Sequence, residues 1–288
     1  MSIITNEELS VLIDKATAGD KSALETIILG VQDMVFNLSL RMLGTFPDAE
    51  DAAQDILLKI VTHLSSFKKE SSFSTWVFRI AANHLINCKK HMFAQHPLSF
   101  EFYGDDIENA NTRDVPDLTQ EVEKDILAEE LKMSCTNVML QCLDPSDRCI
   151  FVLGTMFHAD SRIAADILDI TPAAYRQRLS RVRRKMANFL TAYCGEYGNG
   201  KCRCKNRVDY AIQSRRLNPA ALDYTSAREL PKERLIQFKN AMEEIDGLSG
   251  QFSFGRLYES PERTKQFFRK FLESAAFSTV KSTQEDCT

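Results

Sequence analysis

The sequence lacks the features of exported and membrane-spanning chains. Its first eight residues contain no basic segment leading into an apolar core, so no signal peptide is expected. No stretch approaches about eighteen consecutive apolar residues, so no membrane span is expected either. With 44% hydrophobic and 26% charged residues, the composition is that of a folded globular chain. We therefore expect a cytoplasmic protein of two or three domains with no membrane partner.

The cysteines do not form the pattern of a disulfide framework. The eight cysteines are scattered along a chain with no export signal, which fits reduced thiols. Cys194, Cys202 and Cys204 nevertheless fall within eleven residues, and clustered thiolates suit zinc or another soft metal. Because no fourth ligand is evident and Cys-x-Cys is not a standard zinc-ribbon pair, we predict no metal site and no cofactor. Whether these three thiols bind a metal stays open at this point.

The net charge of −4 hides a strong segregation of charge along the chain. Residues 97–130 contain eleven acidic and two basic residues, whereas residues 171–191 contain six basic residues and no acidic one. Charges farther apart than a Debye length of about 10 Å are largely screened, so the local field decides which surface meets a phosphate backbone. A nucleic-acid partner is therefore compatible with the acidic total.

The chain divides into four segments, and the prediction is an all-α fold. Residues 8–91 and 129–192 contain apolar residues at helical spacing, and no convincing run of alternating strand residues occurs. Residues 92–128 are a polar, acidic linker. Residues 193–288 form an extension in which two amphipathic helices are expected, at 235–245 and 262–272.

A helix-turn-helix is predicted over residues 160–189. Asp160 and Ser161 suit the cap of a short first helix, and Asp169 stands at the turn. Thr171 followed by Pro172 is a strong start signal for the second helix, since Thr accepts a free N–H and Pro suits the first helical position. Two short helices joined by a tight turn match the motif that reads DNA.

A helical wheel of the second helix separates a buried face from a basic one. The buried face contains Tyr175, Leu179, Val182 and Met186. The opposite face collects small, amide and basic residues, and arginines there suit guanine or phosphate. The predicted DNA-binding residues of this helix are Ala173, Arg176, Gln177, Arg178, Ser180, Arg181 and Arg184. An Arg-rich solvated face is the alternative, and the cap and the turn favour DNA binding.

Two other stretches carry a weaker signal. Ser71 and Ser72 are start signals for a helix that carries Phe73 and Trp76 on one face. Aromatic residues interleaved with Lys68, Lys69 and Arg79 suit single-stranded DNA, although Phe73 and Trp76 at helical spacing are more often simply core residues. Asp48 after Pro47 is a suitable N-cap of an acidic helix start, which offers a surface to a basic partner or is simply solvated.

Four stretches in this order resemble extracytoplasmic-function (ECF) sigma factors of bacterial RNA polymerase, over roughly residues 8–191. The matching stretches are residues 24–44, 48–60 (DAEDAAQDILLKI), 73–83 (FSTWVFRIAAN) and 143–183. The resemblance implies that residues 8–91 are sigma region 2 and residues 129–192 are sigma region 4. The first would bind polymerase and melt and read the minus-ten element, and the second would read the minus-35 element.

The resemblance also implies particular site residues and partners. Polymerase binding would fall on Asp48, Asp51, Gln54 and Asp55. Contacts to the opened strand would come from Lys68, Lys69, Trp76, Arg79 and Asn83. Promoter DNA and the polymerase core are the implied partners, and an anti-sigma factor is a further partner that the resemblance leaves open. The protein would not be an enzyme.

The chain departs from the family at three positions and by its extension. Arg162 stands where the family usually has an acidic residue, Asp169 replaces the usual turn glycine, and Tyr175 replaces a small core residue. The extension of residues 193–288 exceeds the minimal family architecture and is predicted to be regulatory, either packing on the core or masking the DNA-binding surface.

Two alternatives to a sigma factor account for less of the sequence. A stand-alone helix-turn-helix regulator would need neither the acidic helix start nor the aromatic stretch around Trp76. A cysteine-dependent enzyme around Cys202 and Cys204 lacks a nearby activating group, because the last histidine is His158. The sigma factor is the leading hypothesis.

Overall fold

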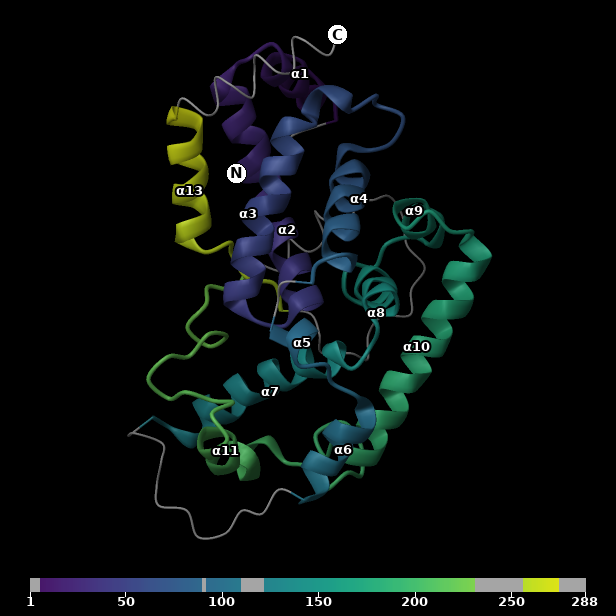
Figure 1. The fold of residues 1–288 in the computed structure, drawn as a ribbon, viewed down its shortest axis with the longest axis vertical. Helices are drawn as coiled ribbons and strands as arrows, with labels where there is room; N and C mark the ends of the chain where they lie inside the picture. The colour runs from purple at the N-terminus through teal and green to yellow at the C-terminus, as the bar shows by residue number, and fades with distance from the viewer. Residues whose placement is uncertain (1–5, 90–91, 110–121, 231–255, 275–288) are drawn as a thin grey trace.

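The computed structural model describes residues 6–89, 92–109, 122–230 and 256–274. The described residues form an all-α fold, as predicted, with two isolated bridges outside the helices. Figure 1 shows the arrangement of the helices around α2. The helices of the N-terminal unit are α1 (Asn6–Thr17), α2 (Lys21–Leu43), α3 (Phe46–Thr62) and α4 (Phe73–Ile86). The later helices are α5 (Met92–Gln95), α6 (Phe100–Asn109), α7 (Lys124–Gln141), α8 (Pro145–Phe151), α9 (Ser161–Ile167), α10 (Pro172–Tyr193), α11 (Cys204–Gln213) and α13 (Glu262–Glu273).

Helix α2 is the core of the N-terminal unit. It is long and apolar enough to cross a membrane by length and composition, but 78% of its apolar window is buried inside the fold. A helix that is apolar on all sides must be covered on all sides, and α1, α3, α4 and α7 pack around it. Gly44 ends α2 in the left-handed conformation, with φ of 89°, and its N–H donates to the carbonyl of Leu40.

The start of α3 differs from the prediction, whereas the start of α4 confirms it. The N-cap of α3 is Thr45 and not Asp48, so the helix begins three residues earlier than expected. The Thr45 hydroxyl accepts from the N–H of Asp48 at 3.3 Å and donates to its carboxylate at 2.7 Å. Pro47 thereby lies inside the first turn, where its missing N–H costs nothing. Ser72 caps α4 as predicted, accepting from the N–H of Thr75 at 3.1 Å.

The predicted linker contains helices in its described part. Residues 92–109 form α5 and α6, and α7 begins at Lys124. Helix α6 is held on α10 by aromatic contacts, since the rings of Phe100 and Tyr103 lie 5.1 and 5.6 Å from that of Phe189. The linker is therefore partly folded onto the helix-turn-helix unit, α7 to α10.

A buried arginine joins the N-terminal unit to the helix-turn-helix unit. The guanidinium of Arg148 donates to the carbonyls of Leu140 and Leu143 at the end of α7, at 3.0 and 2.9 Å. It also donates to the carbonyl of Met42 at the end of α2. Carbonyls in the last turn of a helix have no hydrogen-bond partner within the helix. The guanidinium of Arg148 supplies such a partner both at the end of α2 and at the end of α7. Burial lowers the pKa of Arg148 to about 10.

The two predicted domains share one hydrophobic core. Helix α4 packs against α8 and α9, and the rings of Phe78 and Phe157 meet edge to face at 5.2 Å. At the rim of this contact, Arg79 of α4 pairs with Asp166 of α9 at 2.5 Å. The surface that carries Trp76 and the helix-turn-helix therefore lie in one compact body.

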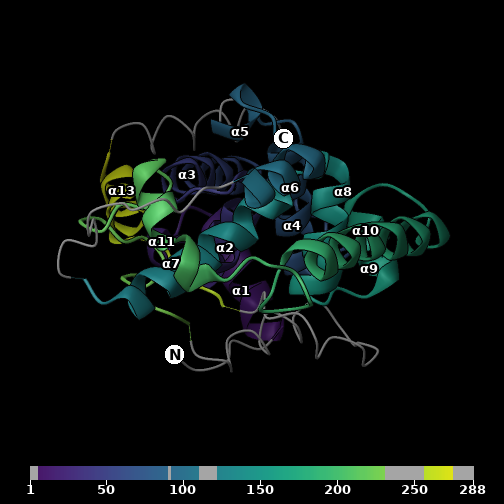
Figure 2. The same cartoon turned by 90° about the horizontal axis from the view of Figure 1, so that it is seen from below.

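The extension packs on both units. Helix α11 lies against α7 (Figure 2). Leu127 of α7 and Val208 of α11 belong to a small core of their own. Residues 256–274 return to α2, where the side chain of Asn37 donates to the carbonyl of Tyr258 at 2.7 Å and accepts from its N–H at 2.8 Å. The predicted helix at 262–272 is confirmed as α13, which packs on α2 and α3. The predicted helix at 235–245 lies outside the described residues.

Candidate polymerase and nucleic-acid interface

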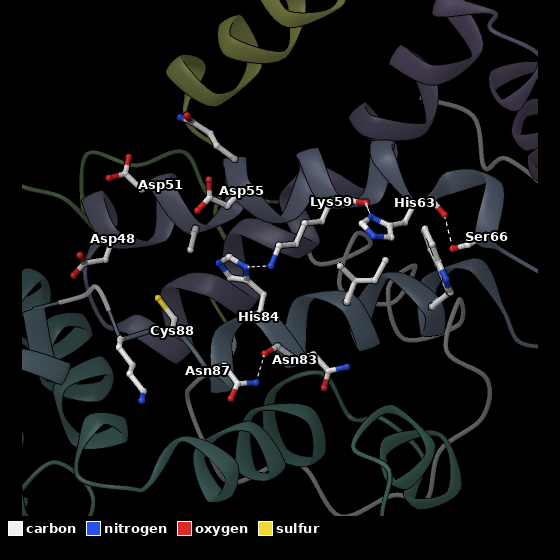
Figure 3. Close-up of a pocket in the computed structure, with 15 residues that line it drawn as sticks. Asp48, Asp51, Asp55, Lys59, His63, Ser66, Asn83, His84, Asn87 and Cys88 are labelled. Carbon is white, nitrogen blue, oxygen red and sulfur yellow. Dashed lines mark hydrogen bonds between the residues drawn. The ribbon is translucent and has the colours of Figure 1, made fainter. Parts of the chain in front are cut away.

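A groove of about 1050 Å³ runs between α3 and α4. It brings together the four predicted polymerase-binding residues and two of the predicted strand-binding residues. These are Asp48, Asp51, Gln54, Asp55, Trp76 and Asn83. Figure 3 shows the acidic residues along α3 and the amide residues along α4, on opposite sides of the groove. Residues that the sequence separates by up to 35 positions thus line one surface.

One end of the groove is acidic. Asp51 and Asp55 are exposed and stand one turn apart on α3, as their spacing of four requires. Asp48 is half-buried, and its carboxylate accepts from the backbone N–H of Met92 at 3.2 Å. Asp48 therefore has a structural task at the start of α3, whereas Asp51 and Asp55 present their charge to solvent.

The middle of the groove contains a contact that the sequence did not suggest. The Lys59 ammonium lies 2.8 Å from Nδ1 of His84, across from α3 to α4. Burial and the neighbouring Lys59 charge both lower the pKa of His84, so its ring is neutral and accepts from Lys59. Lys59 and His84 are 25 residues apart, and a pattern within one helix carries no signal for their pairing.

The α4 wall carries an aromatic and an amide side chain. Trp76 is half-buried, and its ring stacks on Phe73 at 5.6 Å with an interplanar angle of 26°. Phe67 packs against both rings, at 5.4 Å from Phe73 and 5.5 Å from Trp76. Phe73 is therefore core, as the alternative interpretation had it, while Trp76 also lines the groove. Asn83 lies two turns further along α4 and is exposed.

The predicted basic residues of the strand-binding stretch do not line this groove. Lys69 donates to Asp14 at 2.7 Å and to the Ser10 hydroxyl at 2.9 Å, both on α1. Arg79 is engaged by Asp166 of α9, and Lys68 is exposed at the end of the aromatic cluster. The structure thus places these three side chains around the groove rather than in it.

The helix-turn-helix has the predicted caps and turn. Asp160 caps α9 by accepting from the N–H of Arg162 at 2.8 Å, and Thr171 caps α10 by accepting from that of Ala174 at 3.2 Å. Asp169 occupies the left-handed region with φ of 53°, the conformation for which the family uses glycine. Tyr175 is fully buried, and its hydroxyl donates to the carbonyl of Ile150 at 3.3 Å. The phenol therefore fits the core with its polar atom satisfied.

The exposed face of α10 matches the predicted face. Its exposed members are Ala173, Arg176, Gln177, Ser180, Arg181 and Arg184. Arg178, also predicted to bind DNA, is half-buried and pairs with Asp147 of α8, with its Nη2 at 2.6 Å and its Nε at 2.9 Å from one carboxylate oxygen. Arg183 donates to the carbonyl of Gly154 at 2.7 Å. Arg178 and Arg183 hold α10 in place, and the exposed residues stay available.

The comparisons with known proteins agree with this arrangement. Residues 27–90, which begin inside α2 and include α3 and α4, match the family Sigma-70 region 2. The RNA polymerase sigma-H factor of Pseudomonas aeruginosa is 31% identical over 93 residues, which cover 32% of this chain and 47% of that protein. The ECF RNA polymerase sigma factor SigW of Bacillus subtilis is 27% identical over 183 residues, covering 62% of this chain and 94% of SigW.

Two further proteins extend the comparison. The ECF RNA polymerase sigma-E factor of Escherichia coli is 26% identical over 180 residues, 62% of this chain and 92% of that factor. A solved structure, that of CnrH in complex with the cytosolic domain of CnrY, superposes with a TM-score of 0.46 and 18% identity, covering 62% of this chain and 95% of that one.

The match to Sigma-70 region 2 and the alignments to SigW and to the sigma-E factors point to a promoter-directing subunit of a bacterial polymerase. The chain is similar to extracytoplasmic-function sigma factors, and its function is that of an RNA polymerase sigma factor. More than a third of the chain lies outside the alignments to SigW and sigma-E, which cover 62% of it.

Proposed function

We propose that this sigma factor uses the α3–α4 groove for two partners and the exposed face of α10 for a third contact. The acidic end of the groove docks on the core polymerase. The α4 wall holds a base of the opened minus-ten strand, and α10 reads the minus-35 element. The observation that carries this proposal is the convergence of Asp51, Asp55, Trp76 and Asn83 on one groove.

The acidic end suits a basic surface of the polymerase. Asp51 and Asp55 are exposed, and opposite charges that face each other steer two surfaces together and fix their register. Gln54 lies between them on α3 and is half-buried, so its amide lies on the same surface with fewer solvent contacts. Asp48 supports this end through its bond to Met92.

The α4 wall suits an unpaired base. The indole of Trp76 offers a stacking platform, and aromatic platforms accept any base. The amide of Asn83 carries both a donor and an acceptor, which is what selection of a flipped-out base by its exposed edge requires. Lys68 is exposed beside the wall and would track the phosphates of the opened strand, and Lys69 would join it by exchanging its partner Asp14 on α1 for a phosphate.

The exposed face of α10 suits the major groove. Ala173 and Gln177 lie in the first turns, which enter the groove first, and Arg181 and Arg184 follow. Arginine pairs bidentately with guanine or with phosphate. We assign residues 8–91 to sigma region 2, residues 92–128 to the linker, residues 129–192 to region 4 and residues 193–288 to a regulatory extension. The protein would act in the cytoplasm, without a cofactor or a catalytic centre of its own.

A charge reversal at the acidic end tests the docking assignment. We expect Asp51→Arg with Asp55→Arg to weaken binding to purified core polymerase at least about tenfold, because like charges across an interface cost several kcal/mol. Glu108→Arg, on the exposed surface of α6, is the matched control and should bind as the parent does. Equal affinity of the doubly reversed variant and the parent, measured by fluorescence anisotropy, would contradict the assignment.

A further inference from the structure

Thiols gather where the end of α10 meets the start of α11. Cys194 is the C-cap residue of α10, and Cys204 is the first residue of α11. Cys202 and Cys204 also line a second cavity, of about 380 Å³, together with Cys135 of α7. All four are free and partly exposed. The proposed polymerase and DNA contacts use none of them.

The backbone pairs two of these cysteines directly. The N–H of Cys202 donates to the carbonyl of Tyr193 at 3.1 Å, and the N–H of Gly195 donates to the carbonyl of Cys202 at 2.8 Å. These two bonds make a parallel bridge in which Cys194 and Cys202 are opposite each other. Paired backbones in such a bridge lie about 4.8 Å apart, and side chains of opposite residues point to the same side. Disulfides join Cα atoms that are about 4.4–6.8 Å apart, so the pairing suits a disulfide.

The loop between the two cysteines is built for this close approach. A Cβ atom on Gly200 would lie 2.0 Å from the carbonyl carbon of Tyr193, and one on Gly195 would lie 2.5 Å from the carbonyl oxygen of Gly200. Any other residue at either position would push the two backbone segments apart. Arg203 also clamps the loop, because its guanidinium donates to the carbonyl of Gly200 at 2.8 Å. The glycines that the sequence places around the cysteines thus permit the bridge.

The arrangement favours a pair of thiols over a metal centre. Among the residues that the structure describes, no three Cys, His, Asp or Glu side chains are placed to hold a metal ion. The thiol of Cys135 is occupied as the acceptor of a bond from the Tyr103 hydroxyl at 3.0 Å.

We propose that Cys194 and Cys202 form a reversible disulfide that ties the extension to the end of the helix-turn-helix unit. A hydroperoxide oxidises the Cys194 thiol to a sulfenic acid and is itself reduced to an alcohol, or to water in the case of hydrogen peroxide. The Cys202 thiol then attacks the sulfenic sulfur, the S–S bond forms and water leaves. A dithiol reductant restores both thiols by exchange. Disulfides of reduced compartments are usually transient and redox-sensing, which is the role this pair would have.

Peptide mapping tests the pairing because trypsin separates the thiols. Cleavage after Lys185, Lys201, Arg203 and Lys205 places Cys194 on peptide 186–201, Cys202 on dipeptide 202–203 and Cys204 on dipeptide 204–205. The full-length protein is exposed to hydrogen peroxide, its remaining thiols are alkylated, and it is digested with trypsin without reduction. The masses of the resulting peptides are then measured by mass spectrometry. We expect peptide 186–201 joined to dipeptide 202–203 as the main oxidised product, and its loss on treatment with dithiothreitol.

Variants and a metal titration complete the test. Cys194→Ser and Cys202→Ser should each abolish the linked product, whereas Cys204→Ser and Cys88→Ser should retain it. Peptide 186–201 that stays alkylated, or that joins dipeptide 204–205 or the Cys135 peptide 133–148 instead, would overturn the pairing. So would retention of zinc by the reduced protein with protection of all three extension thiols from alkylation, since the cluster would then be a metal site. The wild-type digest decides the question even where a serine variant fails to fold.

Discussion

At the scale of single residues, Trp76 and Asn83 share one wall of the groove but differ in what they contact. The indole packs on Phe73 and Phe67, so it belongs partly to the core. The side chain of Asn83 is exposed, and its backbone carbonyl accepts from the amide of Asn87 at 2.8 Å. A change at Asn83 therefore separates base recognition from stability better than a change at Trp76 does.

Asn83→Ala should spare folding and polymerase binding and impair strand recognition. Alanine is a better helix former than asparagine, so the thermal unfolding midpoint should not fall. On pre-melted bubble templates that carry each base at the minus-ten positions, the holoenzyme with this variant should bind but lose its base preference. Trp76→Ala, in contrast, should lower the thermal unfolding midpoint in addition to impairing strand recognition. If the Asn83→Ala variant kept its full base preference, the proposed role of Asn83 in base recognition would be wrong.

Arg181 and Arg178 should respond differently to substitution. Arg181→Ala should leave the unfolding midpoint unchanged and weaken promoter binding by about 1–3 kcal/mol if the contact is bidentate to guanine. Arg178→Ala should destabilise the protein by about 1 kcal/mol, because it removes the partner of the partly exposed Asp147. Chemical denaturation and promoter titration of both variants make the comparison. A promoter defect as large in Arg178→Ala as in Arg181→Ala, at equal stability, would contradict this division.

The sequence predicted the exposure of a residue correctly where that exposure depends on its position within a single helix. The helical wheel separated Tyr175 and Val182 from Arg181 correctly, because exposure follows from the period of a single helix. The partners of Arg178 and Arg79 were not foreseeable. They lie 31 and 87 residues away, and nothing in a local pattern encodes a pairing across that separation.

At the scale of elements, the caps largely decided where helices begin. Ser72, Asp160 and Thr171 were identified from residue type alone, since each offers a side-chain oxygen to a free N–H. The start of α3 was misplaced because Thr45 and Asp48 both qualify, and the reciprocal bond between them is visible only in three dimensions. The helices inside the linker were missed because the acidic composition of residues 97–130 outweighed the spacing of Phe100 and Tyr103, whose apolar partner is on α10.

At the scale of the whole molecule, the two units and the extension form one body with a shared core. The sequence predicted two domains and an appended segment, because contacts between distant segments carry no periodic signal. Arg148, Asn37 and Arg41 are buried polar residues that would be hard to explain within one unit. Each donates hydrogen bonds to another part of the chain, and Arg41 donates to the amide oxygen of Asn137 at 2.7 Å and to the carbonyl of Arg256 at 2.5 Å.

The ion pair between α4 and α9 should contribute to this association. Arg79→Asp and Asp166→Arg should each lower the free energy of unfolding, and the double exchange should recover most of the loss. The coupling should be at most about 1 kcal/mol, because the two side chains are 38% and 55% exposed and solvent screens them. Urea denaturation of the four proteins measures it. Additive losses in the doubly exchanged protein would show that the pair does not hold the units together.

The central claim is that this chain directs a polymerase to promoters, and transcription from defined starts tests it most directly. Purified core polymerase is incubated with genomic DNA of the source organism, with and without this protein, and the 5′ ends of the transcripts are sequenced. We predict new start sites that depend on the protein and share two upstream sequence blocks. The start sites should be reduced by Arg181→Ala and by the Asp51→Arg, Asp55→Arg variant. Identical start sites with and without the protein would contradict the account.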